Sequence, residues 1–257
     1  RETAQALARA LGSMACPVFI APGNHDFYSP RSLYATLDWP DNVHIFTSPA
    51  VEGVDLPQLN CTVYGRAFCS PHETDSPLAG FQAAEDGRLT LACLHGDTAP
   101  GSGYGPISQE EIAASGLAYL ALGHIHKRGQ KRYGDTLCAW PGCPEGRGFD
   151  ELGEKGFYRG TISDEGKTAL EFVPFARHRY EILEVDVTGR QPRTAVEAAL
   201  PAETARDLYR ILLTGETGEG GAGAKAIQEA LADRFFALEV RDHTRMAEDI
   251  WARAGED

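Results

Sequence analysis

Three short apolar segments of this 257-residue chain each run into a group of polar side chains. The segments Cys16–Ile20, Leu89–Leu94 and Leu117–Leu122 have the length and composition of buried β-strands. In layered α/β folds, functional sites collect at the carboxyl ends of the strands. We therefore expect an α/β fold in which the three polar groups lie along one edge of a sheet.

The polar groups are, in chain order, Gly23-Asn24-His25-Asp26, His95-Gly96 and Gly123-His124-Ile125-His126. Histidine is a common metal ligand, and paired metals suit in-line displacement at phosphorus. His124 and His126 can reach two neighbouring metals from a loop, and Asn24 offers a carbonyl oxygen. His25 supplies a titratable imidazole that Asp26 is able to orient. Each signal alone is weak, but the combination in this order predicts a metal centre for phosphoester chemistry.

Helices, strands and hairpins are predicted along the whole chain. Helices are expected at residues 2–14 and 30–37 and after the capping-box match that starts at Ser108. Further strands are expected near Val43–Phe46, Ala50–Val54 and Cys61–Phe68, and hairpins at Gly129–Tyr133 with Thr136–Trp140 and at Gly156–Ser163 with Lys167–Phe175. This stretch predicts an α/β fold with antiparallel character.

A change of pattern near Arg177 suggests a second domain. Strands are predicted at Tyr180–Val187, Ala205–Leu213 and Phe235–Val240, with helices at Ala224–Leu231 and in the helix-like stretch Met246–Ala254. We therefore expect one domain at residues 1–176 and a small α+β domain at residues 177–257.

Charge and cysteine usage narrow the class of protein. The formal net charge is −13, whereas binding driven by phosphate neutralisation favours a basic surface, so the acidity counts against tight autonomous DNA binding. The six cysteines form no CxxC pair, which suggests structural thiols in a reducing, cytoplasmic setting. No apolar run approaches the roughly 18–20 residues of a membrane span.

The three polar groups resemble the third, fourth and fifth motifs of calcineurin-like metallophosphoesterases. Within that superfamily, residues 22–26 and 122–127 look most like the bacterial SbcD and YhaO-type DNA repair exonucleases. Trp140–Glu151 and Arg210–Gly215 fit the YhaO-like branch in particular. The resemblance implies a β-sandwich flanked by helices, here without its first strands, and a small α+β cap domain that helps to position DNA.

The resemblance also implies roles for individual residues. Asn24, His95 and His124 match ligands of one metal, and His126 matches a ligand of the other. His25 matches the histidine that assists phosphoryl transfer, with Asp26 orienting it. The family usually employs two Mn²⁺ ions, although zinc and iron also suit these donors.

Two upstream motifs of the family, Asp-x-His and Gly-Asp-x-x-Asp, are not found here. The 23 residues before Asn24 contain no aspartate and no histidine. The sequence therefore predicts an N-terminally truncated piece of a longer enzyme, inactive by itself, rather than a degenerate site.

Three functions remain open from the sequence. The leading hypothesis is a DNA exonuclease in DNA repair, for which the resemblance implies an SMC-like ATPase partner and allows a homodimer. The second is a phosphatase or phosphodiesterase for small substrates, which the acidic charge favours slightly. The third is a non-catalytic assembly subunit, supported only by the absent upstream ligands. The basic run Lys127–Arg132 fits either a phosphate-backbone contact or a solvated hairpin edge.

Overall fold

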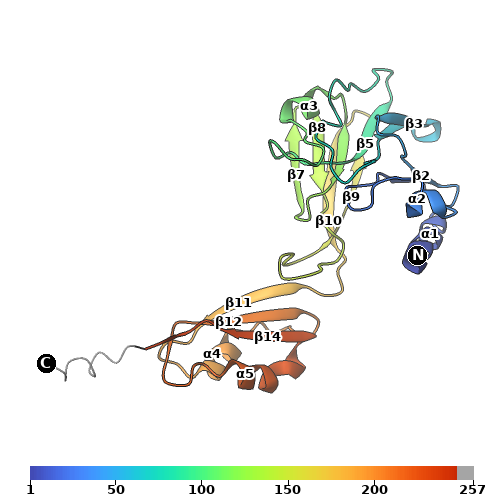
Figure 1. Cartoon of the computed structure of the whole chain (residues 1–257). Helices are drawn as coiled ribbons and strands as arrows, with labels where there is room; N and C mark the ends of the chain where they lie inside the picture. Colours follow the sequence, from blue (N-terminus) through green and yellow to red (C-terminus); the bar gives the residue numbers. More distant parts are fainter. Residues whose placement is uncertain (248–257) are drawn as a thin grey trace. The chain divides into compact units, whose positions relative to one another are not determined.

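The computed structural model describes residues 1–247 and divides the chain into two compact units (Figure 1). The first unit contains Arg1–Cys143 and Phe157–Val173, and the second contains Pro144–Gly156 and the chain from Pro174 onwards. Segment 144–156 therefore belongs with the second unit, whereas the sequence-based division placed it in the first. One reason is that the Glu145 carboxylate accepts hydrogen bonds from the backbone N–H groups of Arg177 and His178, at 2.9 and 3.1 Å.

A six-stranded mixed sheet forms the centre of the first unit, in the order β3-β4-β5-β6-β8-β7. Its strands are β3 (Glu52–Leu56), β4 (Cys61–Gly65), β5 (Leu89–His95), β6 (Tyr119–Gly123), β7 (Gly129–Tyr133) and β8 (Thr136–Trp140). The four inner strands run parallel, and the edge strands β3 and β7 pair antiparallel with their neighbours. This mixed sheet agrees with the expected α/β class with antiparallel character, and the β7–β8 hairpin confirms its prediction.

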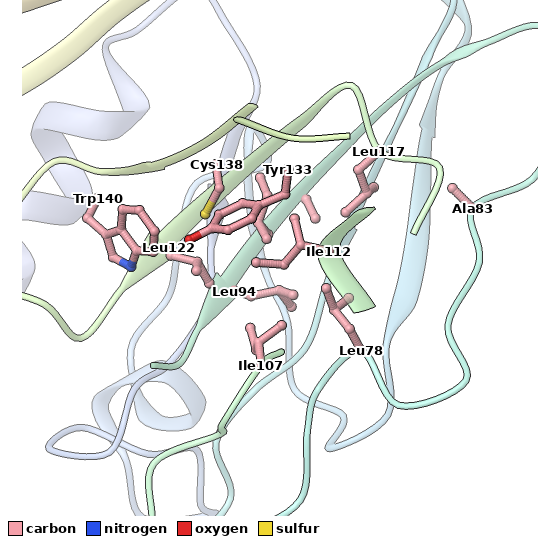
Figure 2. Close-up of a cluster of buried hydrophobic side chains, with 12 residues drawn as sticks. Leu78, Ala83, Leu94, Ile107, Ile112, Leu117, Leu122, Tyr133, Cys138 and Trp140 are labelled. Atoms are coloured by element: carbon pink, nitrogen blue, oxygen red, sulfur yellow. The ribbon is translucent and has the colours of Figure 1, made fainter. Parts of the chain in front are cut away.

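Along β5, buried side chains alternate with partly exposed ones, so the strand contributes both to the hydrophobic core and to the candidate site at its end. Thr90, Ala92 and Leu94 are buried, while the residues between them are partly exposed. Leu94 points into an apolar cluster that includes Ile112 and Trp140 (Figure 2). Because side chains of a strand alternate between its two faces, His95 is directed away from the cluster that holds Leu94.

Shorter elements complete the first unit. They are α1 (Glu2–Gly12), β1 (Val18–Ile20), α2 (Leu33–Thr36), β2 (Val43–Ile45), the 3₁₀ helix η1 (Pro57–Leu59), α3 (Gln109–Ala114), β9 (Gly156–Ile162) and β10 (Thr168–Pro174). β1 pairs parallel with β2, and β9 pairs with β10. The predicted capping box is present at α3, where the Ser108 hydroxyl accepts from the Glu111 N–H and the Glu111 carboxylate accepts from the Ser108 N–H.

The second unit contains a three-stranded parallel sheet in the order β11-β12-β14. Its elements are β11 (Tyr180–Asp186), α4 (Pro192–Ala199), β12 (Leu208–Thr214), β13 (Glu216–Thr217), α5 (Ala224–Leu231), the 3₁₀ helix η2 (Ala232–Arg234), β14 (Ala237–Asp242) and β15 (Arg245–Met246). Helices α4 and α5 lie on the same side of the sheet (Figure 1) and bury Val196 and Ile227 in its core.

Helix α4 changes the description of this unit. The sequence did not predict it, although the Gln191 side chain caps it by accepting from the Thr194 N–H and Pro192 lies in its first turn. With α4 as a crossover, strands and helices alternate along the chain and the strands are parallel, so the expected α+β arrangement is replaced by a β-α-β-α-β unit. Met246 lies in β15, and residues 248–254 of the predicted terminal helix lie outside the described residues.

No helix within residues 1–247 is long and apolar enough to cross a bilayer.

Ile112→Ala should test the energetic importance of the cluster in Figure 2. Ile112 is 0% exposed, and its truncation should lower the free energy of unfolding by about 2–5 kcal/mol, because transfer and cavity costs add. Urea denaturation followed by tryptophan fluorescence would measure this, since Trp140 lies in the same cluster. Leu59→Ala is the control: Leu59 is 58% exposed, and its loss should cost less than about 0.5 kcal/mol. Equal losses in both variants would contradict the assigned core.

Candidate metal centre

The predicted site residues lie where three chain segments meet. His95 ends β5, and the register of the parallel pair sets it opposite Gly123 at the end of β6. The loop after β1 reaches the same place through Phe68, whose backbone N–H donates to the Pro22 carbonyl at 3.0 Å and whose carbonyl accepts from the Tyr28 N–H at 2.7 Å. The carboxyl ends of β1, β5 and β6 thus converge as expected, but not along the edge of one sheet, because β1 pairs with β2 in a separate two-stranded sheet.

Three of the proposed metal ligands lie close together in this region. His95 Nε2 is 2.8 Å from the side-chain oxygen of Asn24. The rings of His95 and His124 meet edge to face, with centroids 5.2 Å apart. Asn24, His95 and His124 therefore form a compact group of nitrogen and oxygen donors.

Two glycines leave space for the His95 ring. A Cβ atom on Gly23 would lie 2.5 Å from His95 Nδ1 and Cε1, and one on Gly123 would lie 2.9 Å from Nδ1. Both distances are shorter than real Cβ contacts allow. The edge of the Phe68 ring, with its centroid 5.0 Å away, restricts the ring further. Gly23 and Gly123, which begin two of the predicted motifs, therefore leave the space that the His95 ring of the remaining motif occupies.

Burial keeps His95 uncharged at neutral pH. Desolvation, followed by the neighbouring His124, lowers the pKa of His95 to about 4. His25 and His126 lower the pKa of His95 further, while Asp26 raises it, so all of these groups lie within electrostatic range. Desolvation is also the main cause of the lowered pKa of His124. Because metals bind the neutral imidazole, both rings are in the protonation state that a ligand requires.

His124 has an unusual backbone conformation, with φ of 91°. Residues other than glycine rarely adopt positive φ, and such strain concentrates at functional sites. The centroid of the His124 ring lies 5.0 Å from that of the Tyr104 ring and 5.2 Å from that of the His95 ring. Packing thus holds His124 in a position that its backbone alone would disfavour.

The remaining predicted site residues are more exposed. His25, Asp26 and His126 are all exposed, in contrast to the buried Asn24. Asp26 accepts hydrogen bonds from the Gly23 N–H at 2.9 Å and from the Tyr34 hydroxyl at 2.5 Å. Between the described residues, no hydrogen bond joins Asp26 to His25. Asp26 therefore closes the Gly23–Asp26 loop, and its orienting role toward His25 remains a prediction.

The loop of His126 depends on a third glycine. Gly142 has φ of +78°, and a Cβ there would lie 2.6 Å from the His126 carbonyl oxygen. Gly142 belongs to Trp140–Glu151, one of the two stretches that resemble YhaO-like proteins. In the second unit these two stretches meet, because the Arg210 guanidinium lies 4.0 Å over the Phe149 ring and also donates to Glu239 at 2.7 Å.

The donor set fits a divalent metal only in part. Asn24, His95 and His124 provide an amide oxygen and two neutral imidazoles, which suit one ion of the manganese or zinc type. Within residues 1–247, however, no three His, Cys, Asp or Glu side chains are arranged to hold a metal. Asp26 is the nearest carboxylate of the motifs, and both of its oxygens are already engaged. The group therefore lacks the anionic ligands that a complete two-metal centre needs.

Sequence reasoning missed several residues that shape the site. Phe68, Tyr34 and Tyr104 support His95, Asp26 and His124, respectively. None of the three belongs to a recognisable motif, so the sequence offered no signal for them. The glycines of the motifs were visible, but their contact with His95 was not.

Neutral imidazoles gathered at strand ends are features of a metal-dependent phosphoesterase, and comparison with known proteins points the same way. No protein-family model matches the chain. It is 29% identical over 185 residues to YhaO of Bacillus subtilis (strain 168), described as an uncharacterized metallophosphoesterase. The similarity covers 70% of this chain and 45% of that protein. It supports the metallophosphoesterase family, and the chain matches less than half the length of that relative.

Gly23→Ala should displace the His95 ring and break its contact with Asn24. We expect a loss of about 1–3 kcal/mol in the free energy of unfolding, as for other overpacked sites. The loss should largely disappear in a His95→Ala background, because the smaller residue makes room for the new methyl group. Denaturant unfolding of the four proteins of this double-mutant cycle measures the coupling.

Gly218→Ala is the matched control, because a Cβ at Gly218 meets nothing within 4 Å. It should leave stability nearly unchanged. If the effect of Gly23→Ala were the same with and without His95, the two residues would not be in the contact described.

Proposed function

We propose that the protein containing this chain hydrolyses phosphodiester bonds with two divalent metal ions, and that its substrate is DNA, degraded as an exonuclease in DNA repair. The observation that carries the proposal is the convergence of Asn24, His95 and His124 at three strand ends, with both imidazoles held neutral. The similarity to a metallophosphoesterase supports the same chemistry. The choice of DNA follows from the motifs that resemble SbcD and YhaO-type exonucleases.

Each site residue has a proposed role. Asn24, His95 and His124 hold one metal, His126 helps to hold the second, and upstream Asp-x-His and Gly-Asp-x-x-Asp motifs would supply the anionic ligands. Bound Mn²⁺ ions would polarise the phosphoryl group and activate water. His25 is exposed beside the ligands and is able to donate a proton to the leaving oxygen.

Most cations of the basic run Lys127–Arg132 contact other residues of this chain, which limits how many of them could bind a DNA phosphate. Arg128 lies 4.0 Å over the Phe172 ring, and Lys131 lies 4.8 Å from the centroid of Tyr133. The Arg132 guanidinium donates to the Asp135 carbonyl at 2.8 Å. These partners favour a solvated hairpin edge for most of the run and leave Lys127 as its best candidate for a phosphate contact.

Two alternatives are each favoured by one observation. The net charge of −13 favours a small phosphorylated substrate over a long polyanion. The lack of a three-residue group of His, Cys, Asp and Glu ligands in the described chain favours a non-catalytic assembly subunit. An SMC-like ATPase partner and a homodimer are further proposals that rest on the family resemblance.

His25→Ala should abolish turnover in the full-length protein without removing the metal. Loss of a general acid should lower kcat by about 10²–10⁴-fold. Mn²⁺-dependent cleavage of labelled duplex DNA would measure the rate, and calorimetric titration with Mn²⁺ would measure binding, which should be nearly unchanged. His124→Ala is the paired variant and should lose both. Full activity in His25→Ala would remove the proposed role of this residue.

The same assay distinguishes the alternatives. The full-length protein should lose activity in EDTA and regain it with Mn²⁺. Rapid hydrolysis of mononucleotides or small phosphodiesters with intact DNA would establish the small-substrate alternative. Failure to hydrolyse any substrate at saturating Mn²⁺ would contradict both hydrolytic functions and support the non-catalytic assembly subunit.

A further inference from the structure

A basic cavity lies wholly within the second unit, apart from the candidate metal centre. Its volume is about 200 Å³, and four of its eight lining residues are lysine or arginine. The lining consists of Glu154, Lys155, Pro174, Ala176, Arg177, Arg179, Arg206 and Asp207. Such a concentration of cations is unexpected in a chain with a net charge of −13.

Internal ion pairing accounts for only part of this positive charge. Arg179 is committed to Asp207, because its guanidinium donates at 2.7 and 3.1 Å and its backbone N–H donates at 3.0 Å. Lys155 is 9% exposed as a residue, but its ammonium is not among the buried polar atoms that lack a partner, and it makes no hydrogen bond or ion pair within residues 1–247. Arg177 and Arg206 are exposed at the rim, where Arg206 reaches only the Arg177 carbonyl, at 3.4 Å. Three cations at this cavity, Lys155, Arg177 and Arg206, thus have no carboxylate partner within the described residues, which suits the cavity to an anion.

An aromatic stack adjoins the same cavity. The rings of His178 and Phe236 are stacked, with centroids 3.9 Å apart and planes 29° apart. Both are tied to residues of the cavity: His178 Nδ1 donates to the Arg206 carbonyl at 2.6 Å, and the Phe236 N–H donates to the Asp207 carbonyl at 3.1 Å. Since His178 covers one face of Phe236 and the residue is still 59% exposed, its other face is open to solvent.

We propose that this site binds single-stranded nucleic acid, with a backbone phosphate at Lys155, Arg177 and Arg206 and a neighbouring base stacked on Phe236. Cationic grooves combined with exposed aromatic rings are how proteins bind single strands without reading sequence. A paired duplex would keep its base faces covered, so the open ring favours unpaired nucleotides. The proposal does not depend on hydrolysis or on metal.

The test uses the full chain in EDTA and a fluorescein-labelled oligodeoxythymidylate of about 16 nucleotides. Anisotropy should show that Phe236→Ala weakens binding at least fivefold, the lower end of the effect of losing one base stack. Phe236→Trp should retain affinity, because it keeps the stacking surface. Thermal unfolding should confirm that both variants are folded. Unchanged affinity in Phe236→Ala would overturn the proposal.

The phosphate contacts are tested through salt dependence. The double variant Arg177→Ala/Arg206→Ala should reduce the slope of log K against log salt by about 1.4, or about 0.7 for each lost contact to a single strand. Arg193→Ala and Lys225→Ala remove cations on α4 and α5 and should change neither slope nor affinity. A slope unaltered in the double variant, or reduced equally in these controls, would contradict the assigned phosphate site.

Competition experiments with two unlabelled ligands test whether the site prefers a single strand to a duplex and to a free nucleotide. Unlabelled duplex of the same length and free thymidine monophosphate should both compete at least tenfold more weakly than the unlabelled single strand. Equal competition by the duplex, or by the mononucleotide, would overturn a single-strand site. Because no metal is present, failure here would leave the hydrolytic proposal intact, and failure of hydrolysis would leave this one intact.

Discussion

The position of the His95 ring is the constraint on which the candidate centre depends. The ring occupies space that any side chain at Gly23 or Gly123 would take, and its Nε2 contacts Asn24 at 2.8 Å. This arrangement requires the parallel register of β5 and β6, which sets His95 opposite Gly123, and the approach of the loop after β1. One buried imidazole thus ties together three segments that are distant in sequence.

The same burial determines the electrostatic character of the group. Asn24 and His124 are neutral donors, and the pKa of His95 is lowered to about 4, so the group offers lone pairs without negative charge. Carboxylates complete the two-metal centre of the metallophosphoesterases that the motifs resemble, and both oxygens of Asp26 already accept hydrogen bonds, from Gly23 and Tyr34. The chain therefore brings together the imidazole and amide donors of the candidate metal centre, and a complete two-metal centre would need anionic ligands in addition.

The sequence was most informative where function depends on local order. A buried strand followed by a polar motif can be recognised from neighbouring residues, and for that reason the strand ends and the capping box of α3 were predictable. Contacts between distant segments were not: nothing near Gly23 indicates that it faces His95, and nothing near Tyr34 indicates a bond to Asp26. Helix α4 was not predicted because it is only eight residues long and has few large apolar side chains. Its start is marked only by the Gln191 cap and by Pro192 in the first turn. The grouping of residues 144–156 depends on Glu145 and Phe149, whose partners lie far along the chain.

Net charge also proved a poor guide to local electrostatics. At physiological ionic strength, charges separated by more than about 8 Å are largely screened from one another. A total of −13 therefore says little about a cavity in which Arg179 neutralises Asp207 and Lys155 remains without a partner in the described chain. The acidity lowers the long-range attraction of any polyanion, so a strand held here must rely on short-range contacts. Stacking on Phe236 is such a contact, because it is insensitive to the overall field and needs only an exposed aromatic face.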